Sequence, residues 1–162
     1  MIMKKTNKNA KTKKIFSLNR KAYYDYEILE KFESGVILSG HEVKSVRHSN
    51  ASLVDGIIRF SNGESFLDNV FIAPYKQMSN HIVDYNARRK RKLLLHKSEI
   101  SKMCAKVKEK GFTVVPLKLY DYEGKIKLLI GLAKGKKMYD KKEAIKKKDI
   151  EREVSKEYRS SL

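Results

Sequence analysis

Charge is distributed so unevenly along this chain that only its central part is able to form a folded body. Residues 1–21 contain eight lysines and arginines and no acidic residue, and residues 134–162 contain eleven basic and six acidic residues. Segments of this composition bury too little apolar surface to offset the entropy lost on ordering. We therefore predict a flexible basic arm over residues 1–21, a folded body over residues 22–133 and a basic tail over residues 134–162 that is disordered alone.

The excess of positive charge indicates the class of partner. A formal net charge of +18 on 162 residues is typical of a protein that binds a polyanion, nucleic acid first and an anionic membrane surface second. A single cysteine, Cys104, excludes an internal disulfide, and no apolar run approaches the length of a membrane-spanning helix. The N-terminal lysines are not followed by the apolar stretch of a secretory signal. The sequence thus indicates a soluble, cytoplasmic protein.

Apolar runs separated by turn signals predict that the body is mainly β. Asn62-Gly63 lies between two such runs and is a strong hairpin signal, because both residues tolerate positive φ. Pro116 interrupts another run and should lie at an edge or a bulge, and Ser34-Gly35 predicts a turn. The predicted strands cover residues 23–32, 53–60, 64–73, 112–120 and 126–133.

Two helices are predicted within the body. One covers residues 41–48. The other covers residues 98–110, where apolar residues recur at helical spacing, Ser98 is the expected N-cap and Gly111 follows the last turn. About six strands with two or three helices, and no regular alternation of strand and helix, predict a mainly β fold with helices (α+β). The expected architecture is an antiparallel barrel of the oligonucleotide-binding (OB) type.

No group of residues has the spacing of a catalytic or metal site. The four histidines are scattered, and residues 131–137 lack both the spacing and the Ser or Thr of a phosphate loop. Cys104 falls on the apolar face of its predicted helix and is expected to be a small core residue. We therefore predict no enzyme, no cofactor and no metal. An RNA-processing enzyme that uses His96 or Glu33 is an alternative without a supporting motif.

Residues 86–97 combine a basic run with apolar residues. Five consecutive cations end at Lys92 and are followed by three leucines and His96. Basic runs bind phosphates with little sequence preference, while an exposed apolar side chain is able to contact an unpaired base. This combination predicts an RNA-binding surface on the barrel.

The tail favours a helix but has a thin apolar face. Residues 141–158 contain no Gly or Pro, and Ile150, Val154 and Tyr158 recur at intervals of four. Such a segment is marginal as an isolated helix and requires a partner surface.

Five motifs, taken in their order and spacing, resemble the SmpB family of SsrA-binding proteins. They lie at residues 18–22, 32–36, 38–47, 91–96 and 131–141. The resemblance implies an OB-type barrel that binds the tRNA-like domain of tmRNA (SsrA RNA). It also implies delivery of tmRNA to stalled ribosomes in trans-translation, with a tail that probes the empty mRNA channel of the small subunit and folds there as a helix. We further expect a monomer that catalyses no reaction and acts with an elongation factor bound to alanyl-tmRNA.

The resemblance also implies roles for single residues. Glu33, Leu94 and His96 match positions that the family uses to bind tmRNA, and Glu33 would accept donors from a base or ribose, or orient a neighbouring cation. The other predicted tmRNA-binding residues are Asn19, Arg20, Lys21, Lys44, Arg47, Arg88, Arg89, Arg91, Lys92, Lys134, Lys136 and Lys137. The residues expected to contact the ribosome through the tail are Tyr139, Asp140, Lys141, Lys142, Ile145, Ile150 and Val154.

The basic composition is also compatible with two other functions. A ribosomal or general RNA-binding structural protein would share the same charge. A membrane-surface protein is disfavoured, because the apolar stripe of the tail lacks the Trp, Phe and Leu of interfacial helices.

Overall fold

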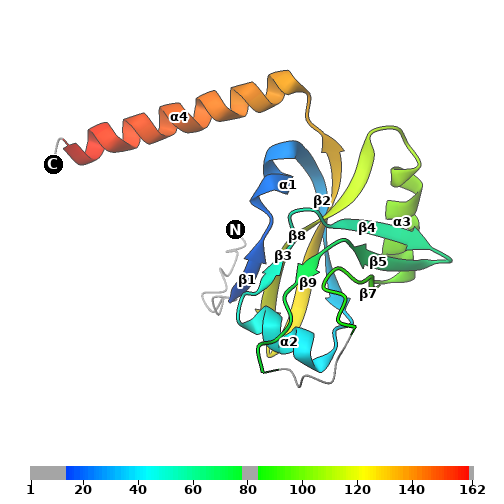
Figure 1. Cartoon of the computed structure of the whole chain (residues 1–162). Helices are drawn as coiled ribbons and strands as arrows, with labels where there is room; N and C mark the ends of the chain where they lie inside the picture. Colours follow the sequence, from blue (N-terminus) through cyan, green and yellow to red (C-terminus); the bar gives the residue numbers. More distant parts are fainter. Residues whose placement is uncertain (1–13, 78–83, 161–162) are drawn as a thin grey trace, which may run out of the picture.

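The computed structural model describes residues 14–77 and 84–160, and over these residues the protein is a mainly antiparallel sheet with four helices (Figure 1). One seven-stranded sheet has the order β1-β8-β9-β2-β7-β5-β4, and every neighbouring pair is antiparallel. The sheet curls, because β4 at one end of this order contacts β8 near the other end. The predicted fold class is confirmed.

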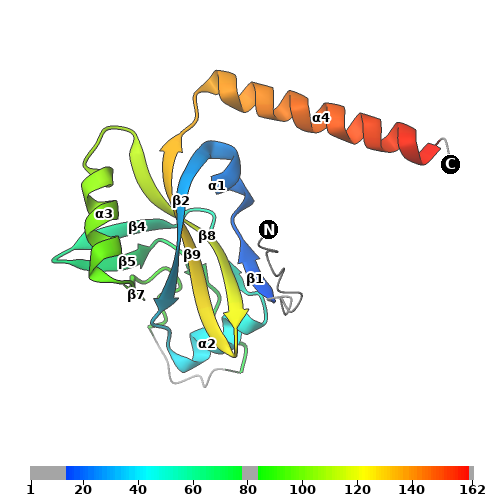
Figure 2. The ribbon, with the colours of Figure 1, turned by 180° about the vertical axis from the view of Figure 1, so that it is seen from behind.

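The strands are β1 (Ile15–Leu18), β2 (Tyr26–Val36), β3 (Ala51–Ser52), β4 (Ile57–Ser61), β5 (Glu64–Asp68), β6 (Phe71–Ile72), β7 (Arg91–Leu94), β8 (Phe112–Tyr122) and β9 (Lys125–Gly135). The helices are α1 (Arg20–Asp25), α2 (Gly40–Arg47), α3 (Lys97–Val107) and α4 (Met138–Ser160). Figures 1 and 2 show α1 and α2 at opposite ends of the curled sheet, α3 at its side, and α4 projecting away from the body.

Two hairpins form where the sequence predicts them. Asn62 (φ 51°) and Gly63 (φ 72°) connect β4 to β5, and Glu123 (φ 50°) and Gly124 (φ 79°) connect β8 to β9. Two successive positive φ values match the twist of the flanking strands. The register of β8 against β9 shifts just after Pro116, which confirms the predicted bulge.

The apolar core lies inside the curled sheet. Its buried leucines and isoleucines come from most strands of the large sheet, and Val46 of α2 and Met103 of α3 pack against them. A smaller cluster under α1 contains Ala22, Leu117 and Ala133. The two clusters together fix the helices of the body to the sheet.

The folded body begins earlier than the predicted boundary at residue 22. β1 pairs with β8 and buries Phe16, and the segment continues directly into α1. A four-residue strand inside a lysine-rich segment is hidden by the average composition of that segment. Residues 1–13 of the predicted arm lie outside the described residues.

The predicted strand over residues 23–32 is wrong at its start, and the predicted turn at Ser34-Gly35 is wrong. Residues up to Asp25 belong to α1, and β2 then runs without a break through Ser34 and Gly35. Ser34 Oγ donates a hydrogen bond to the carbonyl of Leu128 (3.1 Å), so this small polar residue is satisfied inside the sheet.

The predicted strands over residues 53–60 and 64–73 are both shorter than expected. β4 begins only at Ile57, and β5 ends at Asp68, where Asn69 takes a positive φ of 58°. The short strand β6 that follows pairs with β3 in a separate two-stranded sheet.

Both predicted helices form, with different ends. α2 covers Gly40–Arg47, one residue earlier than predicted. α3 starts at Lys97 with His96 as its N-cap, in place of Ser98, and ends at Val107, three residues before the predicted end at residue 110. The backbone amide of His96 donates to the Glu99 carboxylate (3.1 Å), which satisfies a donor at the start of the helix. Gly111 follows α3 with φ 91°, a conformation that favours glycine.

Candidate nucleic-acid interface

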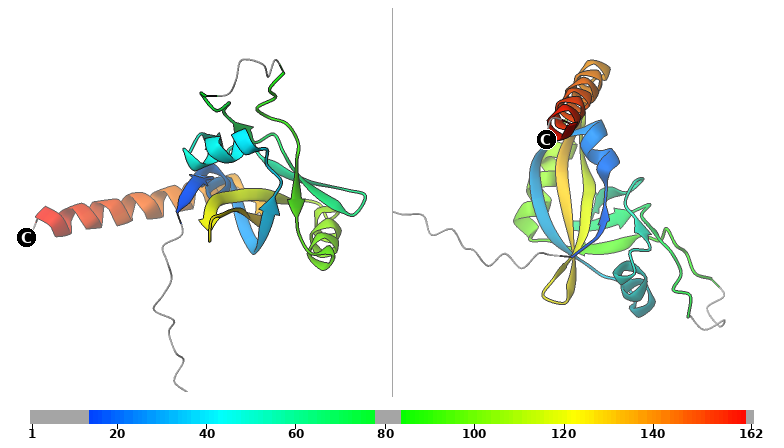
Figure 3. Two further views of the ribbon diagram at one scale, coloured as in Figure 1. Left: turned by 90° about the horizontal axis from the view of Figure 1, so that it is seen from below. Right: turned by 90° about the vertical axis from the view of Figure 1, so that its left-hand side faces the viewer.

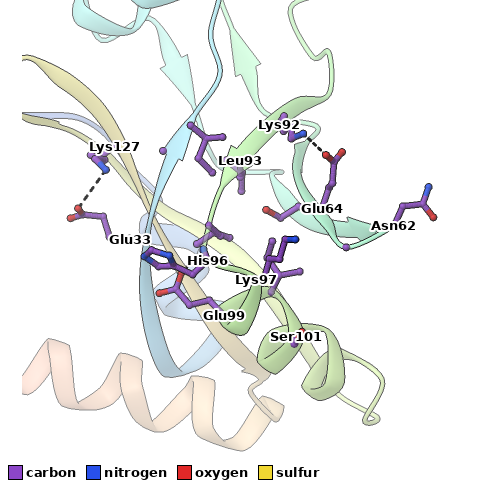
Figure 4. A pocket seen from close by; sticks show the side chains of 16 residues that line it. Glu33, Asn62, Glu64, Lys92, Leu93, His96, Lys97, Glu99, Ser101 and Lys127 are labelled. Atoms are coloured by element: carbon purple, nitrogen blue, oxygen red, sulfur yellow. Dashed lines mark hydrogen bonds and ion pairs between the residues drawn. The ribbon is translucent and has the colours of Figure 1, made fainter.

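A broad hollow of about 1080 Å³ opens between β2, the β4–β5 turn, β7 and the start of α3 (Figure 4). Its lining includes Glu33, Glu64, Lys92, Leu94, His96 and Lys127. We name this the Glu33 hollow. It brings together Glu33, Leu94 and His96, which the resemblance implied as tmRNA-binding residues, and the predicted RNA-binding residue Lys92.

The Glu33 carboxylate is held in place from the neighbouring strands. Its Oε2 accepts a hydrogen bond from the hydroxyl of Tyr120, and its Oε1 lies 3.9 Å from Nζ of Lys127 (Figure 4). Burial, followed by the hydrogen bond to Glu33, raises the pKa of Tyr120 far above its usual value, so the hydroxyl stays a donor. The Glu33 side chain is 40% exposed, so this oriented carboxylate also faces solvent.

Leu94 gives the hollow an apolar surface. Leu93 is buried in the core, so the alternation of β7 turns Leu94 outward, where it is 56% exposed. Leu94 lies opposite Gly35 on β2, and a Cβ at Gly35 would come within 3.2 Å of the Leu94 Cβ. A glycine at this position therefore allows Leu94 to lie close against β2.

The charges of the hollow are mixed rather than uniformly basic. Lys92 forms an ion pair with Glu64, and Lys127 lies beside Glu33. His96 and Lys97 are exposed at the start of α3. A groove that only follows a phosphate backbone would not need carboxylates, whereas base edges and ribose hydroxyls offer donors that carboxylates accept. This arrangement suits an unpaired or splayed nucleotide.

The prediction that Arg91 contacts RNA is wrong. Its side chain is fully buried, and its Nε donates to Oε1 of Glu42 at 2.9 Å. Its other nitrogens donate to the carbonyls of Val70, Arg89 and Ala87. Arg91 therefore connects β7 to α2 inside the protein and is not available to RNA.

Glu42 is the buried partner of this arginine. Burial by itself raises the pKa of Glu42, but hydrogen bonds from Arg89, the Ser39 amide and Arg91 outweigh it and lower the pKa to about 2. Arg89 also donates to this carboxylate and is half-buried. Its guanidinium is therefore paired within the protein.

The prediction that Asn19 contacts RNA is also wrong. The residue is buried, and its Nδ2 donates to the carbonyls of Leu53 (3.0 Å) and Pro116 (2.9 Å). Its Oδ1 accepts the amide of Ala22 (3.1 Å), which caps the start of α1. All its bonds are internal, so we assign it to the fold rather than to RNA binding.

The other predicted RNA-binding cations are not brought to the Glu33 hollow. Lys44 lies over the Tyr75 ring, Arg47 donates to the Gly124 carbonyl (3.0 Å), and Arg88 donates to Asn69. Arg20 and Lys21 lie on α1, Nζ of Lys136 donates to the Tyr23 carbonyl of α1, and Lys137 precedes α4. Lys134 lies over the Phe112 ring, near the end of α3. The predicted residues thus lie in several separate places, and some are in the interior.

α4 carries all the residues predicted for the tail. Its apolar residues Ile145, Ile150 and Val154 are exposed, as is Tyr139. Asp140, Lys142 and most of the helix are exposed too, whereas Lys141 is partly buried against α1.

The sequence did not predict Tyr120 and Lys127 as members of the site, although both contact Glu33. The predicted hairpin of residues 112–120 and 126–133 already places these two residues opposite each other, as the register confirms. The pairing of β2 with β9 places Glu33 beside them, although almost a hundred residues separate the two strands in the sequence. No local signal in the sequence indicates that pairing.

Residues 14–77 and 84–160 contain no group of three His, Cys, Asp or Glu side chains placed to hold a metal ion. None of their helices is long and apolar enough to cross a membrane.

A small antiparallel body with a mixed polar and apolar hollow, exposed cations on several faces and a charged helical extension defines a class, the small basic proteins that bind nucleic acid. Within that class the chain belongs to the SmpB family, because the family model described as "SmpB protein" matches residues 16–160.

Similar proteins agree with this assignment. The SsrA-binding protein of Persephonella marina is 48% identical over 149 residues, covering 92% of this chain and 97% of its own. The SsrA-binding protein of Enterococcus hirae is 49% identical over 141 residues, covering 87% of this chain and 90% of its own. A solved structure described as "tmRNA-SmpB: a journey to the center of the bacterial ribosome" is 48% identical with a TM-score of 0.63, covering 79% of this chain and 92% of the matched chain. The predicted family is confirmed.

Proposed function

We propose that this protein binds the tRNA-like domain of tmRNA and delivers tmRNA to stalled ribosomes in trans-translation. The observation that carries the proposal is the Glu33 hollow, where an exposed Leu94 lies beside a carboxylate held by Tyr120 and Lys127. The relatives named as SsrA-binding proteins and the solved tmRNA-SmpB structure support this choice of RNA.

The hollow binds a splayed nucleotide by three kinds of contact. Leu94 packs against the face of a base, and Glu33 accepts a hydrogen bond from a base amino group or a 2′-hydroxyl. His96 adds a hydrogen bond at the start of α3, and Lys92 and Lys127 favour the nearby phosphates.

The tail acts on the ribosome rather than on tmRNA. The exposed residues of α4 enter the vacant mRNA channel of the small subunit, where cations meet ribosomal phosphates and Tyr139 stacks on a base. Exposed Ile145, Ile150 and Val154 are covered there. The protein acts in the cytoplasm as a monomer, together with an elongation factor on alanyl-tmRNA, and catalyses no reaction.

Filter binding of tmRNA against a size-matched tRNA tests the proposal. Leu94→Ala should weaken tmRNA binding by about fivefold, because the apolar area that Leu94 buries against a base is lost, at about 0.8 kcal/mol for each carbon fully covered. Leu29→Ala is the matched control, since Leu29 is 49% exposed on β2 and does not line the hollow. Equal, weak binding of both RNAs, with no effect of Leu94→Ala, would contradict the proposal. Stoichiometric retention on ribosomes that carry an intact message would favour a ribosomal structural protein.

A further inference from the structure

Two lysines of the Glu33 hollow are already paired with carboxylates of the same chain. Lys92 forms an ion pair with Glu64, and Nζ of Lys127 lies 3.9 Å from Oε1 of Glu33. Figure 4 shows these two pairs at opposite sides of the hollow. A phosphate group that approaches either lysine therefore has to compete with a carboxylate.

The fold keeps Glu64 within reach of Lys92. β5 pairs with β7 so that Phe66 lies opposite Lys92, and the next pair along the strands, Ser65 and Leu93, is buried. Alternation then turns Glu64 and Lys92 to the outer face, where they are diagonal neighbours on adjacent strands. Figure 1 and the left panel of Figure 3 show the tip of the β4–β5 hairpin projecting beside α3. Glu64 follows the turn at this tip and lines the hollow.

The ion pair of Lys92 with Glu64 is accessible enough to be exchanged. The two side chains are 42% and 45% exposed. An ion pair with this exposure contributes little to stability, because water solvates both groups and salt screens them. RNA therefore draws Lys92 away at little cost to the fold. The cost to binding is larger, since Glu64 is then left without its lysine beside a polyanion.

RNAs differ in whether they compensate Glu64 for this loss. Phosphate oxygens offer a carboxylate no donor, so an RNA that only lays its backbone over the hollow leaves Glu64 repelled. A nucleotide splayed into the hollow brings base amino groups and a 2′-hydroxyl, which donate to carboxylates. Such a nucleotide replaces the lost ion pair with a hydrogen bond.

We propose that Glu64 is a specificity-determining residue that keeps Lys92 from binding RNAs that offer the hollow only phosphates. Glu64 neutralises Lys92 in the free protein and accepts a base or ribose donor once a nucleotide enters the hollow. Discrimination of this kind uses a penalty against the wrong partner as well as contacts to the right one. The inference rests on the proposed function, in which the right partner is tmRNA.

Filter binding over a series of salt concentrations tests the role of Glu64. In full-length Glu64→Gln, a size-matched tRNA should bind about three- to fivefold more tightly, because Lys92 is released to a phosphate. The fall of tRNA affinity with salt should become steeper, by up to about 0.9 in the double-logarithmic slope. The affinity for tmRNA should not rise, since Lys92 already contacts a phosphate in that complex. The preference for tmRNA therefore decreases.

Two further variants separate this role from a general change of charge. Glu30→Gln is the matched control, because Glu30 forms a similarly exposed ion pair with Lys102 and neither residue belongs to the described lining of the hollow. It should change the binding of both RNAs by less than about 1.5-fold. In a Lys92→Met background, Glu64→Gln should no longer strengthen tRNA binding, because no lysine is released.

Four results would overturn the proposal. They are unchanged tRNA binding in Glu64→Gln, an equal gain for tRNA and tmRNA, an equal gain in Glu30→Gln, and the same gain in the Lys92→Met background. A wild-type protein that does not prefer tmRNA to tRNA would contradict the proposed function instead. The tRNA affinities of Glu64→Gln with and without Lys92 would then still decide whether Glu64 restrains Lys92.

Discussion

Glu42 stays charged in the interior because its oxygens accept bonds from two arginines and a backbone amide. A buried carboxylate without such donors would be strongly destabilising. The group ties α2 to β7, the strand that places Leu94 in the Glu33 hollow. Its contribution is therefore structural, although it lies within the motif at residues 38–47 that resembles the SmpB family.

The lowered pKa of Glu42 predicts a pH dependence of stability. Folding lowers this pKa from 4.5 to about 2, so the contribution is fully present above pH 4.5 and is lost as the pH falls towards 2. The shift corresponds to about 3 kcal/mol of unfolding free energy. Glu42→Gln should lose about this amount at pH 7 in urea unfolding, and less at pH 3. Glu64→Gln, at an exposed pair, should change stability by at most about 0.5 kcal/mol.

Tyr120 orients Glu33, and this role predicts a binding effect with at most a small effect on folding. Tyr120→Phe should weaken tmRNA binding by about two- to tenfold, because the Glu33 carboxylate is no longer held in one orientation. The unfolding free energy should fall by at most about 1 kcal/mol, since the ring still fills its space and water reaches the 40% exposed carboxylate. Tyr75→Phe, which removes an exposed hydroxyl near α2, is the control. Effects of Tyr120→Phe and Glu33→Gln that simply add would count against a shared role.

At the scale of single residues, the resemblance indicated Glu33, Leu94 and His96, which the structure places in one hollow, but the prediction for Arg91 was wrong. The composition of the basic run at residues 88–92 does not show which of its side chains point into the protein. Once residues 91–94 form a strand, the alternation that buries Leu93 also buries Arg91. The predicted strands did not include residues 91–94, so the inward direction of Arg91 was not foreseen.

At the scale of elements, Gly56 marks the close approach of the chain before β4 to the strand β8. A Cβ at Gly56 would lie 2.5 Å from Cγ2 of Val70 and 2.7 Å from Cγ of Pro116. Gly56→Ala should lower the unfolding free energy by about 1–3 kcal/mol, because neither neighbour has room to move. Gly40→Ala, with no atom within 4 Å of its Cβ, should be neutral or slightly stabilising. Equal effects in urea unfolding would contradict this packing.

The hairpins were predictable because their turns carry local signals, as at Asn62-Gly63. The pairings of β2 with β7 and β9 were not, because they join segments far apart in the sequence. Those long-range pairings build the Glu33 hollow. The sequence alone therefore gives the hollow's residues only through resemblance, and not its geometry.

The helix α4 is expected to serve a step that follows tmRNA binding. Deleting residues 139–162 should leave tmRNA affinity within a few-fold of wild type, because the Glu33 hollow uses none of them. Tagging on stalled ribosomes should be abolished. Tagging at the wild-type rate after the deletion would contradict this division of labour.

At the scale of the whole molecule, the net charge of +18 divides between parts to which the proposed function gives different tasks. The Glu33 hollow holds both signs of charge, as the proposed binding of a splayed nucleotide requires. α4 carries a dense mixture of lysines and acids on an exposed helix and suits a channel lined by phosphates. β9 serves both, because it contributes Lys127 to the hollow and leads into α4. The other elements differ, with β2, the β4–β5 turn, β7 and α3 at the hollow and α1 at the start of α4.

Photo-crosslinking on stalled ribosomes tests most directly whether the body and the tail contact different RNAs. A photoreactive residue at Ser101, in the lining of the Glu33 hollow, and another at Lys146, on α4, leave the proposed contact residues intact. The account predicts that position 101 crosslinks to the tRNA-like domain of tmRNA, and position 146 to RNA of the small ribosomal subunit. Crosslinks from position 101 to ribosomal RNA alone, or from position 146 to tmRNA alone, would contradict it.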